Sequence, residues 1–419
     1  MFRPDLVSGR KSFLLRFFAC LRTFLRYPAA TARTKSGTMS ETASIRFDAI
    51  DADALLRLST PSLFARARAI ADDHWGTVVT FSPKVFLPVT NLCRNRCDYC
   101  AFRRSPGDQG VWTMSPEEIT RTLARASELG CIEALLCLGD NPETAFSSYR
   151  RLLETWGFES TAHYLRWAGE EALRHGLIAH TNAGILNKEE LRLIRPVNAS
   201  MGLMLESVSD RLCQPGQVHH RAPDKRPAVR IAMTERAGQL RIPFTSGLLI
   251  GIGETLEETI DTLSAIADLH RRFGHIQEVI VQNFRAHADT RAATAEEPSA
   301  DHFLRVVALS RCLLPAEISL QAPPNLLPCS LGELVAAGIN DLGGISPMTP
   351  DYINPGHAWP HLGRLESEVG AMGRQLRARL PVYPRFVSSE WLDEPVRSAI
   401  GRADTKRWAS GQVALEEHP

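Results

Sequence analysis

The 419-residue sequence has no apolar run that is both long enough and free enough of charge to span a bilayer. Its strongest candidate, Phe13–Tyr27 (FLLRFFACLRTFLRY), is interrupted by Arg16, Arg22 and Arg26. Such a stretch could lie on a membrane surface, serve as a targeting segment, or belong to a disordered tail or to a start codon placed too early. We expect no stable membrane span.

The sequence also lacks the basic stripe that nucleic-acid-binding proteins carry. Of the 48 basic and 47 acidic residues, eight Lys or Arg and the single Asp5 fall in residues 1–40, which leaves 40 basic and 46 acidic residues in the remaining chain. We therefore expect no nucleic-acid partner. Nor do the nine cysteines form the paired framework of a small secreted domain, which favours a reducing compartment, here the cytoplasm.

From residue 84 onward, short apolar runs alternate with amphipathic helical stretches, a pattern that predicts a parallel sheet with crossover helices. Two helices have clear starts, because Ser115 precedes Pro116 and two acids, and Thr255 precedes Glu257 and Glu258. Eight expected strands with helical stretches between them favour a closed (β/α)8 barrel over an open Rossmann sheet. The expected strands are Lys84–Thr90, Ile132–Gly139, Leu177–Ala183, Ser200–Glu206, Pro243–Ile250, Glu278–Asn283, Ile318–Gln321 and Ile339–Gly343.

We divide the chain into a basic N-terminal extension (1–45), a barrel (46–360) and a C-terminal tail (361–419) that packs on the barrel and contains a helix near Leu365–Leu380. In such barrels the chemistry occurs at the carboxyl ends of the strands. The polar residues expected at those ends are Asn91, Cys93, Gly139, Asp140, Asn141, Asn182, Glu206, Gly251, Glu254, Gln282, Asn283, Asn340 and Asp341.

The run NLCRNRCDYC places the thiols of Cys93, Cys97 and Cys100 in a loop directly after the first expected strand. Structural zinc normally takes four ligands in two pairs, and the sequence has no second CxxC pair. A 4Fe-4S cluster ordinarily takes four thiolates, so three would leave one iron open to chelate the amino and carboxylate groups of S-adenosylmethionine (SAM). The alternative is an electron-transfer centre whose fourth thiolate comes from a scattered cysteine: Cys131, Cys137, Cys213, Cys312 or Cys329.

The CxxxCxxC spacing, with Tyr99 directly before the last cysteine, resembles the signature of the radical SAM superfamily. Further segments resemble, more narrowly, the FO synthase family, subunit 1, the 7,8-didemethyl-8-hydroxy-5-deazariboflavin synthases. These segments are VTNLCRNRCDYCAFRR, LLCLGDNPE, GLMLES, PFTSGLLIGIGET, VQNFRAH and GINDLGGISPMTPDYINPGHAWP, within residues 84–360. Residues 1–40 depart from the family pattern.

This resemblance implies that Cys93, Cys97 and Cys100 bind the 4Fe-4S cluster, with one iron left open for SAM. It also implies SAM contacts: Tyr99 beside the adenine, the backbone of Gly139, Asp140 and Asn141 at the amino group, Glu206 at the ribose or methionine part, and Gly251 and Glu254 near the adenine.

The resemblance further implies a radical SAM carbon-nitrogen (ammonia) lyase of coenzyme F-420 biosynthesis. It would convert 5-amino-5-(4-hydroxybenzyl)-6-(D-ribitylimino)-5,6-dihydrouracil to the deazariboflavin, with release of ammonia, methionine and 5'-deoxyadenosine. Because this substrate is neutral and polyhydroxylated, we expect amide and hydroxyl contacts from Asn182, Thr245, Gln282, Asn283 and Asn340. The candidates for the acid or base in ammonia loss are Asp341, His219 and His220.

The partners implied by the resemblance are a second radical SAM subunit of FO synthase and a flavodoxin- or ferredoxin-type reductant. Two alternatives stay open at this point. The chain could be that partner enzyme, which makes the 4-hydroxybenzyl adduct from tyrosine and 5-amino-6-ribitylaminouracil, or it could be a non-enzymatic iron-sulfur or zinc protein.

Overall fold

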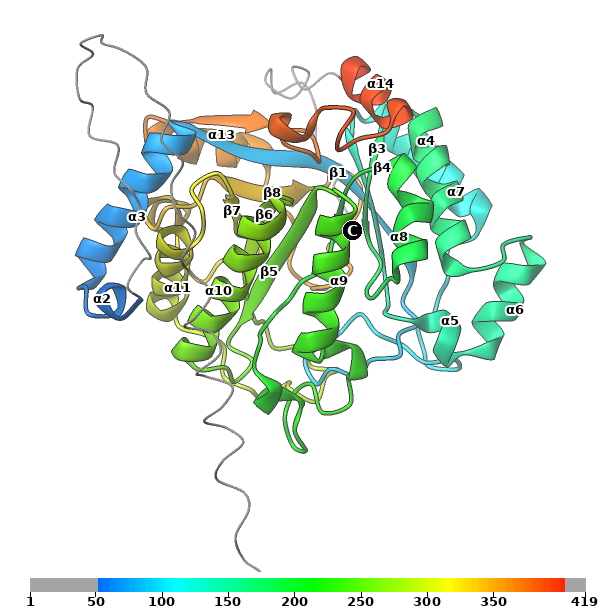
Figure 1. Ribbon diagram of the computed structural model, residues 1–419, viewed down its shortest axis with the longest axis horizontal. Coiled ribbons are helices and arrows are strands. Elements are labelled where there is room, and N and C mark those ends of the chain that lie inside the picture. Colours follow the sequence, from blue (N-terminus) through cyan, green and yellow to red (C-terminus); the bar gives the residue numbers. More distant parts are fainter. Residues whose placement is uncertain (1–51, 404–419) are drawn as a thin grey trace, which may run out of the picture. The chain divides into compact units, whose positions relative to one another are not determined.

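The computed structural model describes residues 52–403, and the expectations about the N-terminal extension and the last residues of the tail lie outside this range. All eight expected strands form, and they pair in parallel in chain order around a closed barrel, because β1 pairs with both β8 and β2 (Figure 1). The barrel strands are β1 (Val78–Thr90), β2 (Glu133–Leu138), β3 (Ile178–Asn182), β4 (Asn198–Gly202), β5 (Phe244–Ile250), β6 (Ile276–Asn283), β7 (Ser319–Gln321) and β8 (Asp341–Ile345).

Helices surround the barrel, and the two starts expected from the sequence are confirmed. The Ser115 hydroxyl accepts from Glu118 N–H while the Glu118 carboxylate accepts from Ser115 N–H, and Thr255 and Glu258 exchange the same pair of bonds. The α-helices are α2 (Ala52–Leu56), α3 (Thr60–Trp75), α4 (Pro116–Glu128), α5 (Pro142–Ala145), α6 (Ser147–Thr155), α7 (Thr161–Arg174), α8 (Lys188–Ile194), α9 (Pro227–Gln239), α10 (Leu256–Phe273), α11 (Ala300–Leu313), α12 (Leu331–Ala336), α13 (Leu362–Ala371) and α14 (Glu394–Arg402). Short 3-10 turns are η2 (Arg195–Val197), η3 (Asp210–Cys213), η4 (Pro223–Lys225) and η5 (Pro384–Phe386).

The apolar residues of β1 and α4 show how the sequence pattern builds the core. Val85, Leu87 and Val89 alternate along β1 and are fully buried, and they belong to the same apolar cluster as Ile119 and Leu123 of α4. The period of two along the strand and of four along the helix brings these side chains together between the two elements. The outer face of the strand is therefore sealed, and the carboxyl end of the barrel is left for polar side chains.

The C-terminal region differs from the sequence expectation. The helix expected near Leu365–Leu380 ends at Ala371, the last residue of α13, and Gly373 follows with a φ of 71°. Residues Gln375–Ala378 form a further strand, β9, which pairs in parallel with Val78–Phe81 of β1. Its side chains alternate between exposed and half-buried, so its four residues gave too short a period-two signal to be distinguished from a helix.

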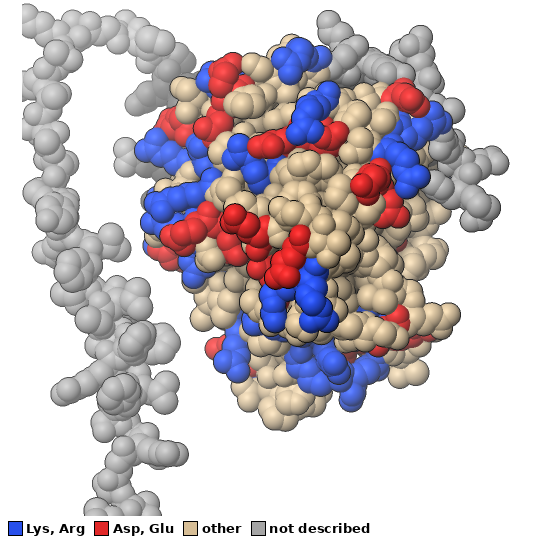
Figure 2. All heavy atoms as spheres, turned by 90° about the vertical axis from the view of Figure 1, so that its right-hand side faces the viewer, with Lys and Arg blue, Asp and Glu red and all other residues tan. Residues whose placement is uncertain are grey.

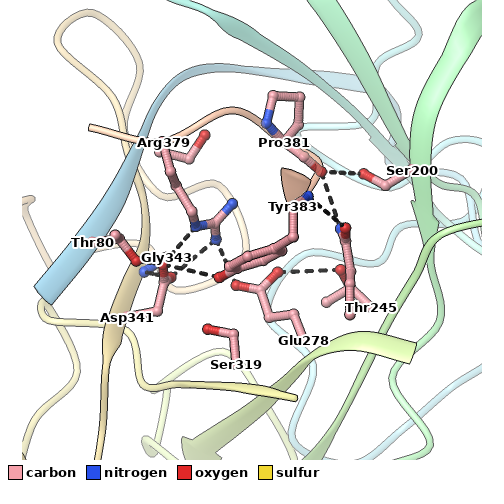
Figure 3. A network of polar contacts seen from close by, with 12 residues as sticks. Thr80, Ser200, Thr245, Glu278, Ser319, Asp341, Gly343, Arg379, Pro381 and Tyr383 are labelled. Carbon is pink, nitrogen blue, oxygen red and sulfur yellow. Dashed lines mark hydrogen bonds and ion pairs between the residues drawn. The ribbon is translucent and has the colours of Figure 1, made fainter. Parts of the chain in front are cut away.

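After β9 the chain crosses the amino-terminal end of the barrel and closes it (Figure 3). The Arg379 guanidinium contacts the Asp341 carboxylate at 2.5 and 2.9 Å and the Glu278 carboxylate at 2.6 Å. The Pro381 carbonyl accepts from Ser200 Oγ at 2.6 Å and from Gln277 Nε2 at 3.0 Å. Because these partners stand near the starts of β4, β6 and β8, the segment ties three strands together at the end opposite the cysteines.

The surface seen in Figure 2 carries both signs of charge. Lys and Arg are interspersed with Asp and Glu over the face that includes α5, α6 and α7. Among residues 52–403, no helix combines the length and the apolar character needed to cross a membrane.

Candidate active site

The loop between β1 and α4 carries the three clustered cysteines, and backbone contacts fix its course. Cys93 N–H donates to the Arg104 carbonyl at 3.2 Å, and Arg104 N–H donates to the Asn91 carbonyl at 2.7 Å. Asn91 Nδ2 donates to the Gly110 carbonyl, and Asn91 Oδ1 accepts from Trp112 N–H. The loop is therefore folded back on itself beside the carboxyl end of β1.

All three thiols line one pocket of about 220 Å³ at the carboxyl end of the barrel. Of the remaining cysteines among residues 52–403, none lines it, so the part of the chain that the structure describes offers no fourth thiolate there. Within the same range no three His, Cys, Asp or Glu side chains form a group that could hold a single metal ion. A cubane cluster binds each thiolate to a different iron, so three spaced thiols suit it better than one zinc ion.

The thiols differ in burial: Cys97 is buried, whereas Cys93 and Cys100 are half-buried. Burial raises the pKa of Cys93 to about 11, although the Asp140 N–H that donates to its Sγ at 3.1 Å opposes this. Burial also raises the pKa of Cys97, against the opposing charge of Lys225. A metal that takes thiolate ligands must therefore displace these protons, as binding of iron does. The donor set fits a 4Fe-4S cluster held by Cys93, Cys97 and Cys100.

Gly139, at the end of β2, allows the backbone to pass close to the cysteine loop. A Cβ at this position would stand 2.1 Å from the Leu92 carbonyl oxygen and 2.6 Å from Cys93 Cβ. Arg94 N–H also donates to the Asp140 carbonyl at 2.9 Å. The expected Gly139-Asp140-Asn141 segment thus lies directly against the loop, although only Gly139 and Asp140 line the pocket.

The Asp140 carboxylate holds several segments together at the pocket wall. It accepts from Asn95 Nδ2 at 3.1 Å, from Ile185 N–H at 2.9 Å and from Asn141 Nδ2 at 3.1 Å, and Arg230 lies 3.7 Å away. Burial raises its pKa, which the Arg230 charge opposes. These contacts occupy the carboxylate, so it organises the wall of the pocket.

Glu206 is the centre of a buried hydrogen-bonded group. Its carboxylate contacts Lys225 Nζ and the Tyr99 hydroxyl, and it lies 3.3 Å from His219 Nε2. The Tyr99 hydroxyl is also 2.9 Å from His219 Nε2. Glu206 has a φ of 65°, a strained backbone conformation for a residue with a side chain, and it turns this carboxylate toward Lys225 and Tyr99.

Burial and neighbouring charges together set the protonation states of Glu206, Tyr99 and His219. Burial opposes the ionisation of Glu206, but Lys225, His219 and Arg230 outweigh it and hold the pKa of the carboxyl well below its usual value. Burial and the neighbouring Glu206 charge raise the pKa of Tyr99 well above its usual value. Burial lowers the pKa of His219, although Glu206 opposes this. At neutral pH the group contains a carboxylate, an intact phenol and a neutral imidazole.

Besides Asn141, the expected SAM contacts Gly251 and Glu254 also lie outside the pocket lining. The Glu254 carboxylate accepts from Gly251 N–H at 2.7 Å and from Ile252 N–H at 2.9 Å, so it closes the turn after β5. Burial raises its pKa, and these backbone donors oppose the rise. Neither Gly251 nor Glu254 lines the pocket, whereas Leu248 and Leu249 of β5 do.

The expected substrate contacts divide in the same way. Asn182 and Gln282 line the pocket, and neither side chain has a hydrogen-bond partner among the described residues. Asn283 Nδ2 donates to the Leu326 carbonyl, and Thr245 Oγ1 donates to Glu278 near the amino-terminal end of the barrel. The Asn283 and Thr245 side chains therefore make hydrogen bonds within the fold and do not line the pocket.

The expectation that Asn340 and Asp341 follow the eighth strand is wrong. β8 begins at Asp341, so both residues lie at the amino-terminal end of the barrel, away from the cysteines. Asn340 Oδ1 accepts from the buried Arg311 and from Leu320 N–H, while Asp341 pairs with Arg379. The strand was displaced in the sequence reading because the apolar Ile339 precedes these two polar residues.

The two histidines expected to handle protons differ from each other. His219 is 4% exposed and does not itself line the pocket, but it contacts two residues that do, Tyr99 and Glu206. His220 is exposed. His219 thus positions its neighbours, and the structure gives His220 no contact with the site.

Sequence reasoning missed several residues that line the pocket. For Arg230 a signal existed, because it shares the buried face of α9 with Pro227, Met233 and Ala237, where a charge needs a partner. The others lie in loops without periodicity. The missed polar and aromatic residues are Asn95, Phe102, Lys225, Arg230, Phe284, Arg285, His287 and Asn354.

Comparison with known proteins identifies what the chain resembles. A family model described as the radical SAM superfamily matches residues 87–266. The 7,8-didemethyl-8-hydroxy-5-deazariboflavin synthase of Methanosarcina barkeri is 44% identical over 322 residues, which cover 77% of this chain and 96% of that protein. The same enzyme of Methanoculleus marisnigri is 46% identical over 80% of this chain and 98% of that protein. The FO synthase of Mycobacterium tuberculosis is 44% identical over 77% of this chain but only 39% of its own length.

Solved structures agree on the fold. The FeFe-hydrogenase maturase HydG from Carboxydothermus hydrogenoformans superposes with a TM-score of 0.65 at 21% identity, covering 87% of this chain and 85% of that chain. Methylornithine synthase superposes with a TM-score of 0.58 at 20% identity, covering 78% of this chain and 93% of that chain. At this identity the likeness concerns the barrel alone.

Proposed function

Because the chain belongs to the radical SAM family of 7,8-didemethyl-8-hydroxy-5-deazariboflavin synthases, we propose that it closes the deazaflavin ring as an ammonia lyase. The substrate is 5-amino-5-(4-hydroxybenzyl)-6-(D-ribitylimino)-5,6-dihydrouracil, and the products are the deazariboflavin, ammonia, methionine and 5'-deoxyadenosine. The observation that carries the proposal is that Cys93, Cys97 and Cys100 line one pocket without a fourth described cysteine. Such a donor set leaves one iron of a 4Fe-4S cluster for SAM.

A cluster on these thiols would supply one electron for cleavage of the SAM carbon-sulfur bond. The chain's own residues arrange the remainder of the site. Glu206 and Tyr99 line the pocket as fixed polar groups for SAM, and Lys225 keeps Glu206 ionised. Gly139 brings the end of β2 close enough to the cysteine loop for its backbone to contact SAM. His219 supports this arrangement by holding Tyr99 and Glu206 from behind.

The apolar part of the lining suits a reaction that must exclude water. Leu203, Met204, Leu248, Leu249 and Phe284 surround the polar groups of the pocket. A reactive carbon radical survives only where solvent and stray hydrogen donors are kept away. Asn182 and Gln282 add unpartnered amides suited to a neutral, polyhydroxylated substrate.

The length comparison supports a partner subunit. The chain covers only 39% of the Mycobacterium tuberculosis FO synthase, so that protein has room for a second enzyme in the same polypeptide. We propose that here the second activity, which makes the adduct, resides in a separate radical SAM protein, and that a flavodoxin- or ferredoxin-type protein delivers the electron.

The test uses the cluster-loaded protein under anaerobic conditions with SAM and a chemical reductant. One reaction contains the dihydrouracil adduct, and a second contains tyrosine and 5-amino-6-ribitylaminouracil. We expect consumption of the adduct only. Consumption of tyrosine and the aminouracil without a second protein would assign the chain to the partner activity instead.

A further inference from the structure

The lining of the pocket differs between the two sides of the barrel. On one side, the segments after β2 and β4 supply Asp140, Glu206, Lys225 and Arg230, and these charged groups are paired with one another. The loops after β6 and β8 supply Phe284, Arg285, His287, Ile353 and Asn354, of which Arg285 is paired with Glu297 outside the pocket lining. Since β6 and β8 stand across the closed sheet from β2 and β4, these loop residues face the pocket from the other side.

His287 has the feature that demands an explanation. Its Nε2 atom is buried and has no hydrogen-bond partner among the described residues. A buried polar atom without a partner costs free energy. Of the residues in the described range that contain such an atom, only His287 and Arg103 line the pocket. The imidazole of His219, on the other side of the pocket, is by contrast engaged by both Tyr99 and Glu206.

Hydrogen bonds and an ion pair hold the loop that carries His287, so the backbone that positions its ring is fixed. Arg285 donates to the Leu326 carbonyl and pairs with Glu297 at 2.5 Å, and Ala286 N–H donates to the same carboxylate at 2.9 Å. The His287 carbonyl accepts from Thr290 N–H at 3.0 Å and from Thr290 Oγ1 at 2.8 Å. These bonds fix the backbone on both sides of the ring.

A second set of contacts holds the opposing loop. The Asp351 carboxylate accepts from Asn354 N–H and Nδ2, both at 3.1 Å, and from Asn325 Nδ2 at 3.0 Å. His357 of the same loop packs edge-to-face on His287, with ring centroids 6.0 Å apart. The imidazole of His287 is therefore oriented by one loop and supported by the other.

We propose that His287 Nε2 is a substrate-binding position, which takes a hydroxyl or an amide N–H of the polar substrate. This assignment rests on the proposed function and adds to it a recognition residue on the β6 side. An imidazole nitrogen can donate a hydrogen bond to such a group or accept one from it, according to its tautomer. Because the ring is already held in place, substrate binding costs little conformational entropy in this side chain. Asp351 acts as a positioning residue for the opposing wall.

The test compares His287→Phe, which keeps the ring shape without a polar atom, with His287→Gln, whose amide reaches about as far as Nε2. Binding of the dihydrouracil adduct to the cluster-loaded protein with SAM is measured by calorimetry, and turnover is measured separately. We expect His287→Phe to weaken adduct binding by about tenfold, the loss expected for one hydrogen bond. His287→Gln should recover most of it, and both variants should bind SAM as the parent does.

The exposed His220→Phe serves as the matched control and should change neither affinity. Equal losses in His287→Phe and His287→Gln, or a loss of SAM affinity in either, would mean that the ring only supports the fold and would overturn the assignment. Unchanged adduct binding in His287→Phe would overturn it as well. If the parent protein binds the adduct but forms no deazaflavin, the proposed function fails while the binding comparison still decides the role of His287.

Discussion

Replacing Arg379 with methionine should lower the free energy of unfolding, because it leaves buried carboxylates at the amino-terminal end of the barrel without their ion-pair partner. The side chain of Arg379 is 10% exposed, and it pairs with Asp341, which is fully buried, and with Glu278, which is 6% exposed. Removing the cation leaves both carboxylates without their ion-pair partner in a low-dielectric environment, where only the more distant Lys84 still favours ionisation of Glu278. Breaking a buried pair in this way costs about 3–5 kcal/mol. This is a large part of the stability of a typical domain.

The variant should also show a defined dependence on pH. Burial and the nearby Asp341 charge raise the pKa of Glu278 from 4.5 to about 7, and Arg379 opposes this rise. Loss of Arg379 raises it further, so the folded variant binds protons that the unfolded chain does not. A group with a raised pKa in the folded state contributes stability at low pH that is lost as the pH increases. The deficit of Arg379→Met should therefore be small near pH 5 and largest above pH 7.

The assay is urea or thermal unfolding at several pH values, with Arg377→Met as the matched control. Arg377 stands two residues earlier on β9 and is exposed, and its Nη2 donates to the Gln375 side chain. Its replacement should change stability by less than about 0.5 kcal/mol. Equal effects of the two substitutions, or a deficit of Arg379→Met that grows as the pH falls, would refute the reasoning.

Three further substitutions test the site. Cys97→Ala should abolish 5'-deoxyadenosine formation and cluster binding, whereas Cys213→Ala should leave both within about twofold, as measured by product analysis and iron content; equal losses would indicate a fourth ligand. Gly139→Ala should prevent cluster assembly because its Cβ would stand 2.1 Å from the Leu92 carbonyl, whereas Gly363→Ala in α13, with open space around it, should assemble normally, and normal iron content in both would contradict the packing argument. Lys225→Met removes the cation beside Glu206 and should weaken SAM binding, measured by equilibrium dialysis, by about tenfold or more. Unchanged SAM binding would mean that Glu206 does not contact SAM.

The sequence was sufficient for the barrel because its signal is repeated. Short apolar runs alternate with helical stretches along the whole barrel, and two of the helices have clear starts, at Ser115 and Thr255. β9 escaped because its four residues are only half-buried, and its place is set by pairing with β1 rather than by its own pattern.

The cysteine loop could likewise be assigned from spacing, because the chemistry of three neighbouring thiols does not depend on distant residues. Asp341 could not, since the same carboxylate is a candidate base at one end of a strand and half of a structural ion pair at the other. Only the position of the strand start and the arrival of Arg379 from a segment 38 residues later decide between these roles.

His287 and Asn354 show a further limit. They belong to loops without periodicity, and they reach the pocket only because Arg285 and Asp351 brace those loops through contacts with carbonyls and amides far away in the sequence. Side-chain contacts of this kind depend on tertiary structure, and no local sequence pattern predicts them.

The most direct measurement of the central claim is a time course with the cluster-loaded protein, SAM, reductant and the dihydrouracil adduct under anaerobic conditions. Fluorescence follows the deazaflavin while chromatography follows 5'-deoxyadenosine. We predict that both products appear together, and only when the adduct and SAM are both present. Protein that holds zinc without iron, or a cluster that consumes SAM without forming deazaflavin from the adduct, would contradict the account.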